Sequence, residues 1–234
     1  MAGKGTRTQS LGMFKPFILI NGKEMFSWFI SSIKHLVKPN DTFLLITLEE
    51  NFNKYGFEKI TKEILINHAL NNKAEYFSVP TTPHGTSETI MVAKKCVSKK
   101  EKVIVIYPDQ YTDFDIPSQI DGCAYLGVYV QLGNKSGFVT VQNGKVTRFV
   151  EKENISNIAS SGFYIFPTGD DLIYGIDKQI KEGKSLNGEY YLGPIFNYLI
   201  ERGMTVYPIA VKSKYDLGNP EDILYFSKNF AIKS

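Results

Sequence analysis

Residues able to bind phosphate gather near the start of the chain. The segment MAGKGTR contains Gly3, Gly5, Thr6 and Arg7, and Lys15 follows eight residues later. Glycines at a turn leave backbone N–H groups free to converge on a phosphate, and an arginine and a lysine add the charge that a triphosphate requires. A glycine-rich loop alone is more often a structural turn, so the prediction depends on the two cations. The proline after Lys15 predicts an extended backbone at that lysine.

Two aspartates could hold a divalent cation. Asp109 ends the apolar segment KVIVIYPDQY, and Asp216 precedes a Gly-Asn-Pro turn in YDLGNPED. A carboxylate at the end of a buried strand is costly unless a cation or hydrogen bonds compensate it. Mg²⁺ takes one or two protein carboxylates together with phosphate oxygens and water. The alternative interpretation of Asp216 is a turn-forming or capping residue.

The first half of the chain alternates strands and helices. Apolar or amphipathic patterns predict strands at 17–20, 42–48, 74–80 and 102–111, and helices at 25–37, 57–70 and 86–97. Thr86 or Ser87 could cap the last of these helices, with Glu88 in its first turn. The alternation predicts an α/β fold with a mainly parallel sheet flanked by helices. Sites in such sheets lie beyond the carboxyl ends of the strands, where Asp109 falls.

The second half of the sequence has a different pattern of secondary structure. Segments 124–132, 136–152 and 159–167 have the pattern of antiparallel strands, with QNGK as a hairpin turn, and two helices, a strand and a final helix follow. There is no repeat and no linker. We therefore expect a single domain over 1–234, with a nucleotide-binding part at 1–115 and a smaller antiparallel, acceptor-binding part at 116–234.

Composition narrows the classes of partner. The chain has 234 residues, with 27 Lys and Arg against 24 Asp and Glu. This nearly balanced charge does not indicate nucleic acid or an anionic membrane as a binding partner. Cys96 and Cys123 lack the spacing of a zinc site or a disulfide framework. No segment has the length of a membrane span or a secretion signal, so we expect a cytoplasmic protein. The composition leaves a homo-oligomer open.

Eight motifs together resemble one family. AGKGTR, KPFILINGKEMFSWFI, HGTSETI, YPDQY, FVEK, SSGFYIF, GEYYL and YDLGNPEDILYF occur in the order typical of sugar-1-phosphate nucleotidyltransferases. The closest likeness is to the capsule- and surface-polysaccharide branch, which resembles nucleoside-diphosphate-sugar pyrophosphorylases, and it covers nearly the whole chain. The resemblance implies a Rossmann-like nucleotidyltransferase fold of the GT-A-like type.

The resemblance also implies where the nucleotide binds. It assigns the nucleotide base to the backbone of the first loop residues and to a second loop, and the phosphates to the glycines and cations. The nucleotide-binding residues by this likeness are Ala2, Gly3, Gly5, Thr6, Arg7, Lys15, Gly85, Thr86 and Asp109. Because the segment TTPHGTSET lacks the glutamine of the thymidylyl and uridylyl members, the choice among cytidylyl, thymidylyl and uridylyl transfer stays open.

The same resemblance assigns the metal and the acceptor. Asp109 and Asp216 match the two metal-binding aspartates, for Mg²⁺ with Mn²⁺ as the alternative. Glu151 matches a residue that holds a hydroxyl or similar polar group of the acceptor, and Lys152 one that holds its phosphate. Glu189 matches a position that also contacts the acceptor. The acceptor could be a sugar 1-phosphate or a non-sugar phosphate such as phosphoglutamine.

The implied reaction joins two anions. An acceptor phosphate oxygen attacks the α-phosphorus of a nucleoside triphosphate and pyrophosphate leaves, as a step toward capsule or surface polysaccharide precursors. The catalytic residues would be Arg7, Lys15, Asp109 and Lys152, acting by positioning and charge neutralisation. A general base is not needed, because a phosphate monoester is largely ionised near neutral pH.

Three further expectations complete the sequence analysis. The family loop normally follows a short apolar strand, and that first strand is missing before Met1, so we expect the natural chain to begin earlier. A GT-A glycosyltransferase is one alternative, because Asp113 and Asp115 form a D-x-D pattern. A non-catalytic nucleotide-binding regulator is the other. Pyrophosphate release separates the first alternative from a nucleotidyltransferase, and loss of turnover in Asp109→Asn separates the second.

Overall fold

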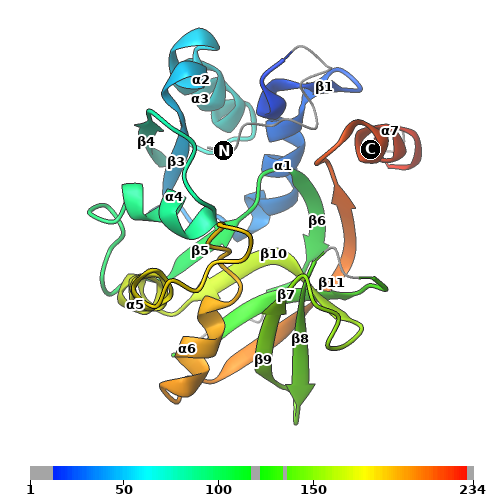
Figure 1. The fold of residues 1–234 in the computed structure, drawn as a ribbon. Coiled ribbons are helices and arrows are strands. Elements are labelled where there is room, and N and C mark those ends of the chain that lie inside the picture. The colour runs from blue at the N-terminus through cyan, green and yellow to red at the C-terminus, as the bar shows by residue number, and fades with distance from the viewer. Residues whose placement is uncertain (1–12, 117–121, 134–135, 231–234) are drawn as a thin grey trace. The chain divides into compact units, whose positions relative to one another are not determined.

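The computed structural model describes residues 13–116, 122–133 and 136–230 (Figure 1). These residues form two compact units. The first unit contains the described residues up to Thr82, together with Pro108–Asp113 and those from Ser213 onward, and the second contains Pro83–Tyr107 and the described part of Phe114–Lys212. The predicted phosphate loop, with Ala2, Gly3, Gly5, Thr6 and Arg7, lies outside the described residues. No helix in the described ranges is both long and apolar enough to cross a membrane.

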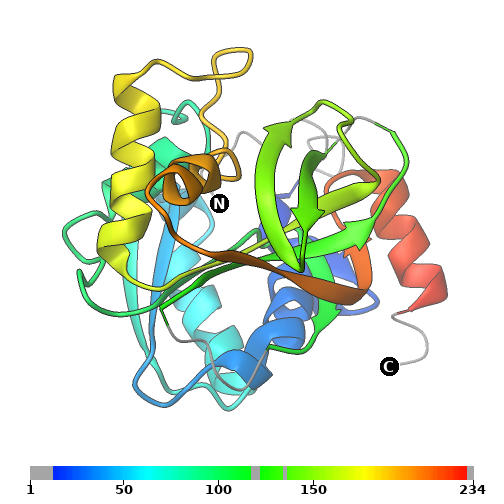
Figure 2. The ribbon, with the colours of Figure 1, turned by 90° about the horizontal axis from the view of Figure 1, so that it is seen from below.

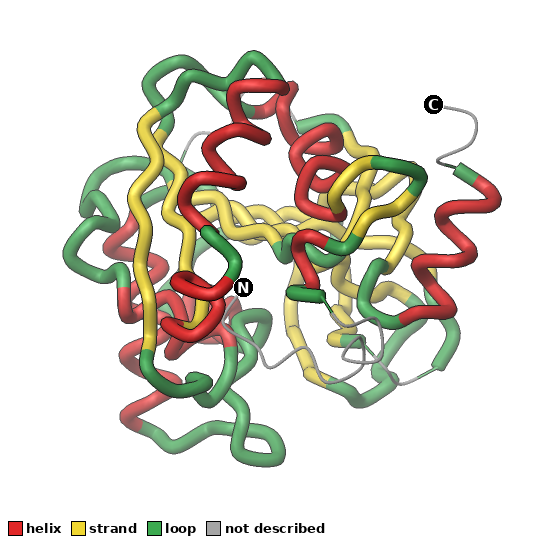
Figure 3. The backbone as a smooth tube through the Cα atoms, turned by 90° about the horizontal axis from the view of Figure 1, so that it is seen from above, coloured by secondary structure: helices red, strands yellow, loops and turns green. Residues whose placement is uncertain are grey.

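The first unit combines a short hairpin, a parallel strand pair and helices. Asn21 and Gly22 turn the hairpin with φ of 49° and 79°, the left-handed backbone that an Asn-Gly hairpin requires. Strands β3 and β4 run parallel and in register from Thr42↔Lys73 to Leu48↔Val79 (Figures 1 and 3). The elements of this unit are η2 (Lys15–Phe17), β1 (Leu19–Ile20), β2 (Lys23–Glu24), α1 (Met25–Ile33), η3 (Lys34–Leu36), β3 (Thr42–Leu48), α2 (Glu49–Lys54), α3 (Phe57–Asn67), β4 (Lys73–Val79) and α7 (Pro220–Asn229).

Aromatic packing fixes the segment that carries Asp216. Trp28 of α1 packs edge-on against Phe226 of α7, with ring centroids 5.4 Å apart, and its Nε1–H donates to the Ile20 carbonyl at 2.9 Å. Leu217, fully buried, belongs to the same cluster. Burying one leucine side chain contributes about 2 kcal/mol to the stability of the folded state. The burial of Leu217 therefore anchors the turn that follows Asp216.

The second unit is built on a mixed sheet. The strand order among the described residues is β6-β11-β7-β10-β8-β9, and β5 pairs with β10. β11 and β7 are parallel, whereas β10 is antiparallel to β5, β7 and β8, and β8 is antiparallel to β9. The strands are β5 (Val103–Ile106), β6 (Gln110–Phe114), β7 (Ala124–Val130), β8 (Gly137–Gln142), β9 (Lys145–Glu151), β10 (Ile158–Phe166) and β11 (Val206–Asp216). The ends Gln110–Asp113 and Ser213–Asp216 belong to the first unit.

Two helices pack side by side against this sheet. Figure 2 shows α5 (Gly169–Lys181) beside α6 (Ile195–Glu201), with α4 (Thr86–Val92) completing the helices of the unit. Apolar side chains from both α5 and α6 enter one core, in which Phe166 stacks on Phe196 with centroids 5.0 Å apart. The Asn197 side chain of α6 accepts from the Phe149 N–H and donates to its carbonyl, each at 2.8 Å. α6 therefore holds the edge strand β9 as a neighbouring strand would.

Three local predictions were wrong. The strand predicted at 102–111 is interrupted: β5 ends at Ile106 and β6 begins at Gln110, so Asp109 lies in the connection between two strands. Lys15 lies in the short 3-10 helix η2, and the extended residue is Phe14, because a proline in the second position of a tight turn lacks only an N–H that the turn does not use. Neither Thr86 nor Ser87 caps α4: Gly85 is the N-cap, and the Ser87 hydroxyl instead donates to Gln179 at 2.8 Å. Glu88 does lie in the first turn, where its side chain accepts from the His84 N–H.

Candidate active site

Lys15 and Asp109 meet in the first unit although 94 positions separate them. The Lys15 ammonium lies 2.7 Å from the Asp109 carboxylate, and the lysine side chain is 19% exposed. Burial favours the neutral acid, but the charge and hydrogen bond of Lys15 outweigh it and lower the pKa of Asp109. Asp109 is therefore an ionised carboxylate at neutral pH with a cation beside it.

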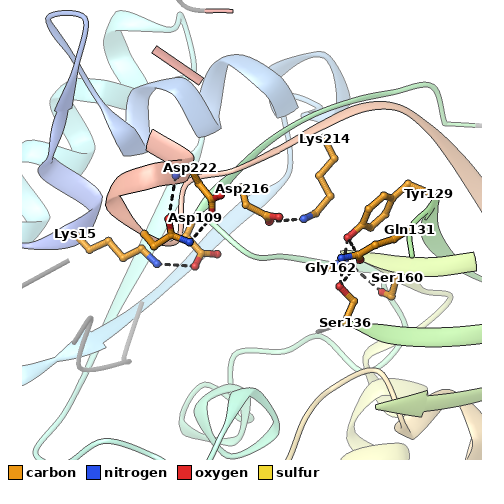
Figure 4. Close-up of polar contacts among 11 residues, drawn as sticks. Lys15, Asp109, Tyr129, Gln131, Ser136, Ser160, Gly162, Lys214, Asp216 and Asp222 are labelled. Carbon is orange, nitrogen blue, oxygen red and sulfur yellow. Dashed lines mark hydrogen bonds and ion pairs between the residues drawn. The ribbon is translucent and has the colours of Figure 1, made fainter. Parts of the chain in front are cut away.

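Asp216 is held next to Asp109 by the backbone. The Leu217 N–H donates to the Asp109 carbonyl at 2.8 Å, so the segment that contains Asp216 runs beside the segment that contains Asp109. Lys214, two residues before Asp216 on β11, pairs with the Asp216 carboxylate (Figure 4). Gly218 passes close by: a Cβ there would stand 3.8 Å from the Asp109 carboxylate.

A third carboxylate borders this group. Asp222 lies in the first turn of α7, where its N–H donates to the side chain of the N-cap residue Asn219 at 2.9 Å. Burial raises the pKa of Asp222, and the charge of Asp216 adds to the increase. We call Lys15, Asp109, Lys214, Asp216 and Asp222 the Asp109 cluster (Figure 4).

The Asp109 cluster supplies the ligand type that Mg²⁺ prefers. Hard divalent cations prefer carboxylate oxygens, which Asp109 and Asp216 provide. Among the residues described, no three or more His, Cys, Asp or Glu side chains gather closely enough to hold a metal ion by themselves, so a cation here would take its other ligands from phosphate and water. The lysines balance part of the negative charge in the absence of a cation and could receive phosphate oxygens in its presence. The cluster thus suits an ion shared between protein carboxylates and a phosphate chain.

Glu151 ends strand β9 in the second unit, and Lys152 follows it directly. Glu151 pairs with Gly137 of β8, and a Cβ at Gly137 would stand 2.3 Å from the Phe149 ring and 2.8 Å from the Glu151 carboxylate, so a larger residue there would displace both side chains. Burial raises the pKa of Glu151 to about 7; Lys152 opposes the increase and Glu189 adds to it. Near neutral pH Glu151 can therefore accept or donate a hydrogen bond to a polar group.

The segment that carries Glu189 is tied to the loop at Gly85. A tight turn joins Leu186 and Glu189, each of which donates its N–H to the other's carbonyl at 3.0 Å. The Tyr190 N–H donates to the His84 carbonyl at 2.7 Å. Gly85 has φ of +102°, and a Cβ there would lie 2.6 Å from the Tyr190 carbonyl oxygen. Glycine is therefore required at this position by both conformation and space.

The predicted residues thus form two groups. Lys15, Asp109 and Asp216 come together in the first unit; Glu151, Lys152 and Glu189 lie near one another in the second, where Gly85 and Thr86 begin α4 beside the Glu189 segment. Asp115 of the D-x-D pattern is exposed and forms an ion pair with Lys212 at 2.7 Å, and it belongs to neither group.

Sequence reasoning missed several neighbours of these residues. Lys214 could have been found from its K-x-D spacing, which puts both side chains on one face of a strand. Asp222 fits the capping pattern of an N-P-E-D segment. Tyr191 and Gln179 carry no local signal, because their relation to Lys152 and to Ser87 exists only in the folded chain.

Comparison with known proteins decides the family. The sequence model of the family described as "Nucleotidyl transferase" matches residues 1–232. The chain belongs to this family. Family membership and the mixed α/β nucleotidyltransferase fold predicted from the sequence are therefore confirmed.

The individual relatives are distant. The bifunctional protein GlmU of Methanococcus aeolicus is 27% identical over 237 residues, a match that covers 95% of this chain and 51% of that protein. The chain thus spans about half the length of the curated relatives it matches. The crystal structure of a nucleoside-diphosphate-sugar pyrophosphorylase from Vibrio cholerae RC9 is similar with a TM-score of 0.82 and 22% identity, over 97% of this chain and 98% of that one. The inositol-1-phosphate CTP transferase of T. maritima is similar with a TM-score of 0.70 and 16% identity, over 98% and 94%.

Proposed function

We propose that this protein transfers a nucleoside monophosphate from a nucleoside triphosphate to a small phosphorylated acceptor and releases pyrophosphate. The observation that carries the proposal is the Asp109 cluster: a lysine ammonium 2.7 Å from an ionised carboxylate, with Asp216 on the adjoining segment. A nucleotidyltransferase needs this combination, because a triphosphate must be bound and a departing pyrophosphate stabilised. Membership of the family supports the same reaction.

Each residue has a distinct part in the proposed reaction. An acceptor phosphate oxygen bonds to the α-phosphorus, and the bond from that phosphorus to the bridging oxygen of the β-phosphate breaks. Asp109 and Asp216 would hold Mg²⁺, which when bound neutralises phosphate charge. Lys15 would stabilise the negative charge that develops on pyrophosphate, together with Arg7 from the predicted phosphate loop. Lys152 would bind the acceptor phosphate, and Glu151 a hydroxyl or similar group of the acceptor.

Two observations suggest more specific substrates. The motifs resemble the capsule- and surface-polysaccharide branch, so we propose a sugar 1-phosphate or a non-sugar phosphate as acceptor and a role in making a surface polysaccharide precursor. The T. maritima structure is described as an inositol-1-phosphate CTP transferase, which makes CTP and a cyclitol phosphate a pair worth testing. We expect the reaction to take place in the cytoplasm, because nucleoside triphosphates are found there.

A pyrophosphate-release assay tests the proposal. The protein is incubated with Mg²⁺ and each of ATP, CTP, GTP, UTP and dTTP against glucose 1-phosphate, inositol 1-phosphate and phosphoglutamine. We expect acceptor-dependent release with one pair, reduced at least about 100-fold in Asp109→Asn and Asp216→Asn. Asp115→Asn is the matched control, since its carboxylate is paired with Lys212, and it should keep full activity. Nucleoside diphosphate in place of pyrophosphate would mean that the γ-phosphate is transferred or hydrolysed, and would overturn the proposal. Release of nucleoside diphosphate from an added nucleotide sugar, lost in Asp115→Asn alone, would instead support a glycosyltransferase.

A further inference from the structure

Lys152 is held in an uncommon conformation. It follows β9 with a left-handed φ of 56°, and its N–H donates to the Ser136 carbonyl at 3.0 Å. Ser136 is itself fixed, because its hydroxyl donates to the Gln131 side chain at 2.7 Å (Figure 4). The backbone therefore directs the Lys152 side chain, although the side chain itself is exposed and long enough to adopt many rotamers.

One tyrosine contacts the end of that side chain in two ways. The Lys152 ammonium lies over the Tyr191 ring, 4.5 Å from the centroid, and also donates a hydrogen bond to the Tyr191 hydroxyl. A cation over an aromatic face is stabilised by the ring quadrupole. Because an ammonium has three N–H donors, the bond to one hydroxyl leaves others for a phosphate.

Tyr191 is in turn fixed from the interior of the unit. Its carbonyl accepts hydrogen bonds from Gln179 Nε2 at 2.8 Å and from Ser87 Oγ at 3.4 Å. Gln179 and Ser87 are 1% and 0% exposed and bond to each other at 2.8 Å. A buried, satisfied pair of this kind is rigid, so it fixes the Tyr191 backbone from which the side chain reaches Lys152.

We propose that Tyr191 is the positioning residue for Lys152: its ring face and hydroxyl hold the ammonium where an acceptor phosphate binds. The inference rests on the proposed function, which gives Lys152 that phosphate. Preorganisation lowers the entropic cost of binding, so loss of Tyr191 weakens phosphate binding without altering the nucleotide side of the reaction.

Lysine labelling tests the inference without turnover. Lys152 is methylated by formaldehyde and borohydride and quantified by mass spectrometry, with inorganic phosphate as the probe that protects it. We expect the phosphate concentration for half protection to rise about threefold in Tyr191→Phe, which keeps the ring, and about tenfold in Tyr191→Leu, which loses ring and hydroxyl. Tyr198→Phe is the matched control. The Tyr198 ring on α6 also faces a lysine, Lys184, at 5.4 Å, and its hydroxyl donates to the Glu182 carboxylate at 3.0 Å.

Kinetics then separate positioning from a structural effect. In the wild-type background the acceptor KM should rise by the same factors, while kcat and the nucleotide KM stay unchanged. In a Lys152→Met background Tyr191→Leu should add nothing, since the two residues act through one contact. Unchanged protection in both Tyr191 variants, or an equal KM effect of Tyr191→Leu without Lys152, overturns the inference. If wild-type protein released no pyrophosphate with any pair, the proposed function would fail, whereas the labelling would still decide the role of Tyr191.

Discussion

Glu151→Gln should stabilise the protein at alkaline pH. The folded protein keeps the Glu151 proton up to about pH 7, because burial raises the pKa of this carboxyl from its ordinary value of 4.5. The unfolded chain releases the proton near the ordinary value. Between these pH values the folded state binds more protons than the unfolded state, so stability falls as pH rises and stays low above pH 7. Glutamine resembles the neutral acid and lacks this loss.

The size of the effect follows from the two pKa values. The folded pKa of about 7 and the ordinary value of 4.5 correspond to a loss of about 3 kcal/mol, since each pH unit is worth about 1.4 kcal/mol. For a chain of this size that is a shift in Tm of roughly 6 to 12 °C. At pH 4 both forms are protonated and wild-type and variant proteins should unfold together.

Thermal unfolding from pH 4 to pH 9, followed by circular dichroism, measures the difference. Fluorescence is less suitable because the only tryptophan, Trp28, belongs to the first unit whereas Glu151 belongs to the second. Glu182→Gln is the matched control: hydrogen bonds from Lys184 and Tyr198 lower the pKa of that exposed carboxyl, so its variant should not gain stability at high pH. Parallel pH profiles for wild type and Glu151→Gln would refute the reasoning.

Two further variants test the framework of the second unit. Gly85→Ala should destabilise the protein by about 2 to 3 kcal/mol, because φ is +102° and the new Cβ meets the Tyr190 backbone, whereas Gly183→Ala, with φ of +63° and no atom within 4 Å, should cost about 1 kcal/mol; equal losses in urea unfolding would contradict this. Asn197→Ala should cost about 1 to 3 kcal/mol and speed hydrogen exchange at the Phe149 N–H, which loses its acceptor; an unchanged exchange rate would show that β9 is held by other contacts.

Local chemistry made much of the fold predictable. Two Asn-Gly pairs, at Asn21 and Asn143, signalled hairpins, and both adopt the left-handed backbone that such turns need. The helical spacing at 57–70 corresponds to α3 over Phe57–Asn67. Predictions failed where tertiary contacts overrode local preference. Ser87 is drawn away from capping by a buried glutamine, and β10 changes register between Ser160 and Tyr164 in a way that no periodicity reveals.

The candidate site likewise has features that the sequence predicts and features that only the fold reveals. The types of the site residues could be recognised from the sequence, because cations, carboxylates and tight turns each imply a chemistry. Their pairing could not, since the contact of Lys15 with Asp109 depends on how the intervening chain folds. The raised pKa of Glu151 likewise depends on its burial and on the charge of Glu189, neither of which a motif records.

Phosphorus-31 NMR of the protein with Mg²⁺, CTP and inositol 1-phosphate, repeated with the other nucleotides and acceptors, tests the central claim most directly. The account predicts that, with one nucleotide and acceptor pair, a pyrophosphate signal grows together with two coupled signals from the diphosphate that joins nucleoside and acceptor. These signals should appear only when acceptor is present, and not with the folded Asp109→Asn variant. Inorganic phosphate or nucleoside diphosphate as the product, or the same spectra from Asp109→Asn, would contradict it.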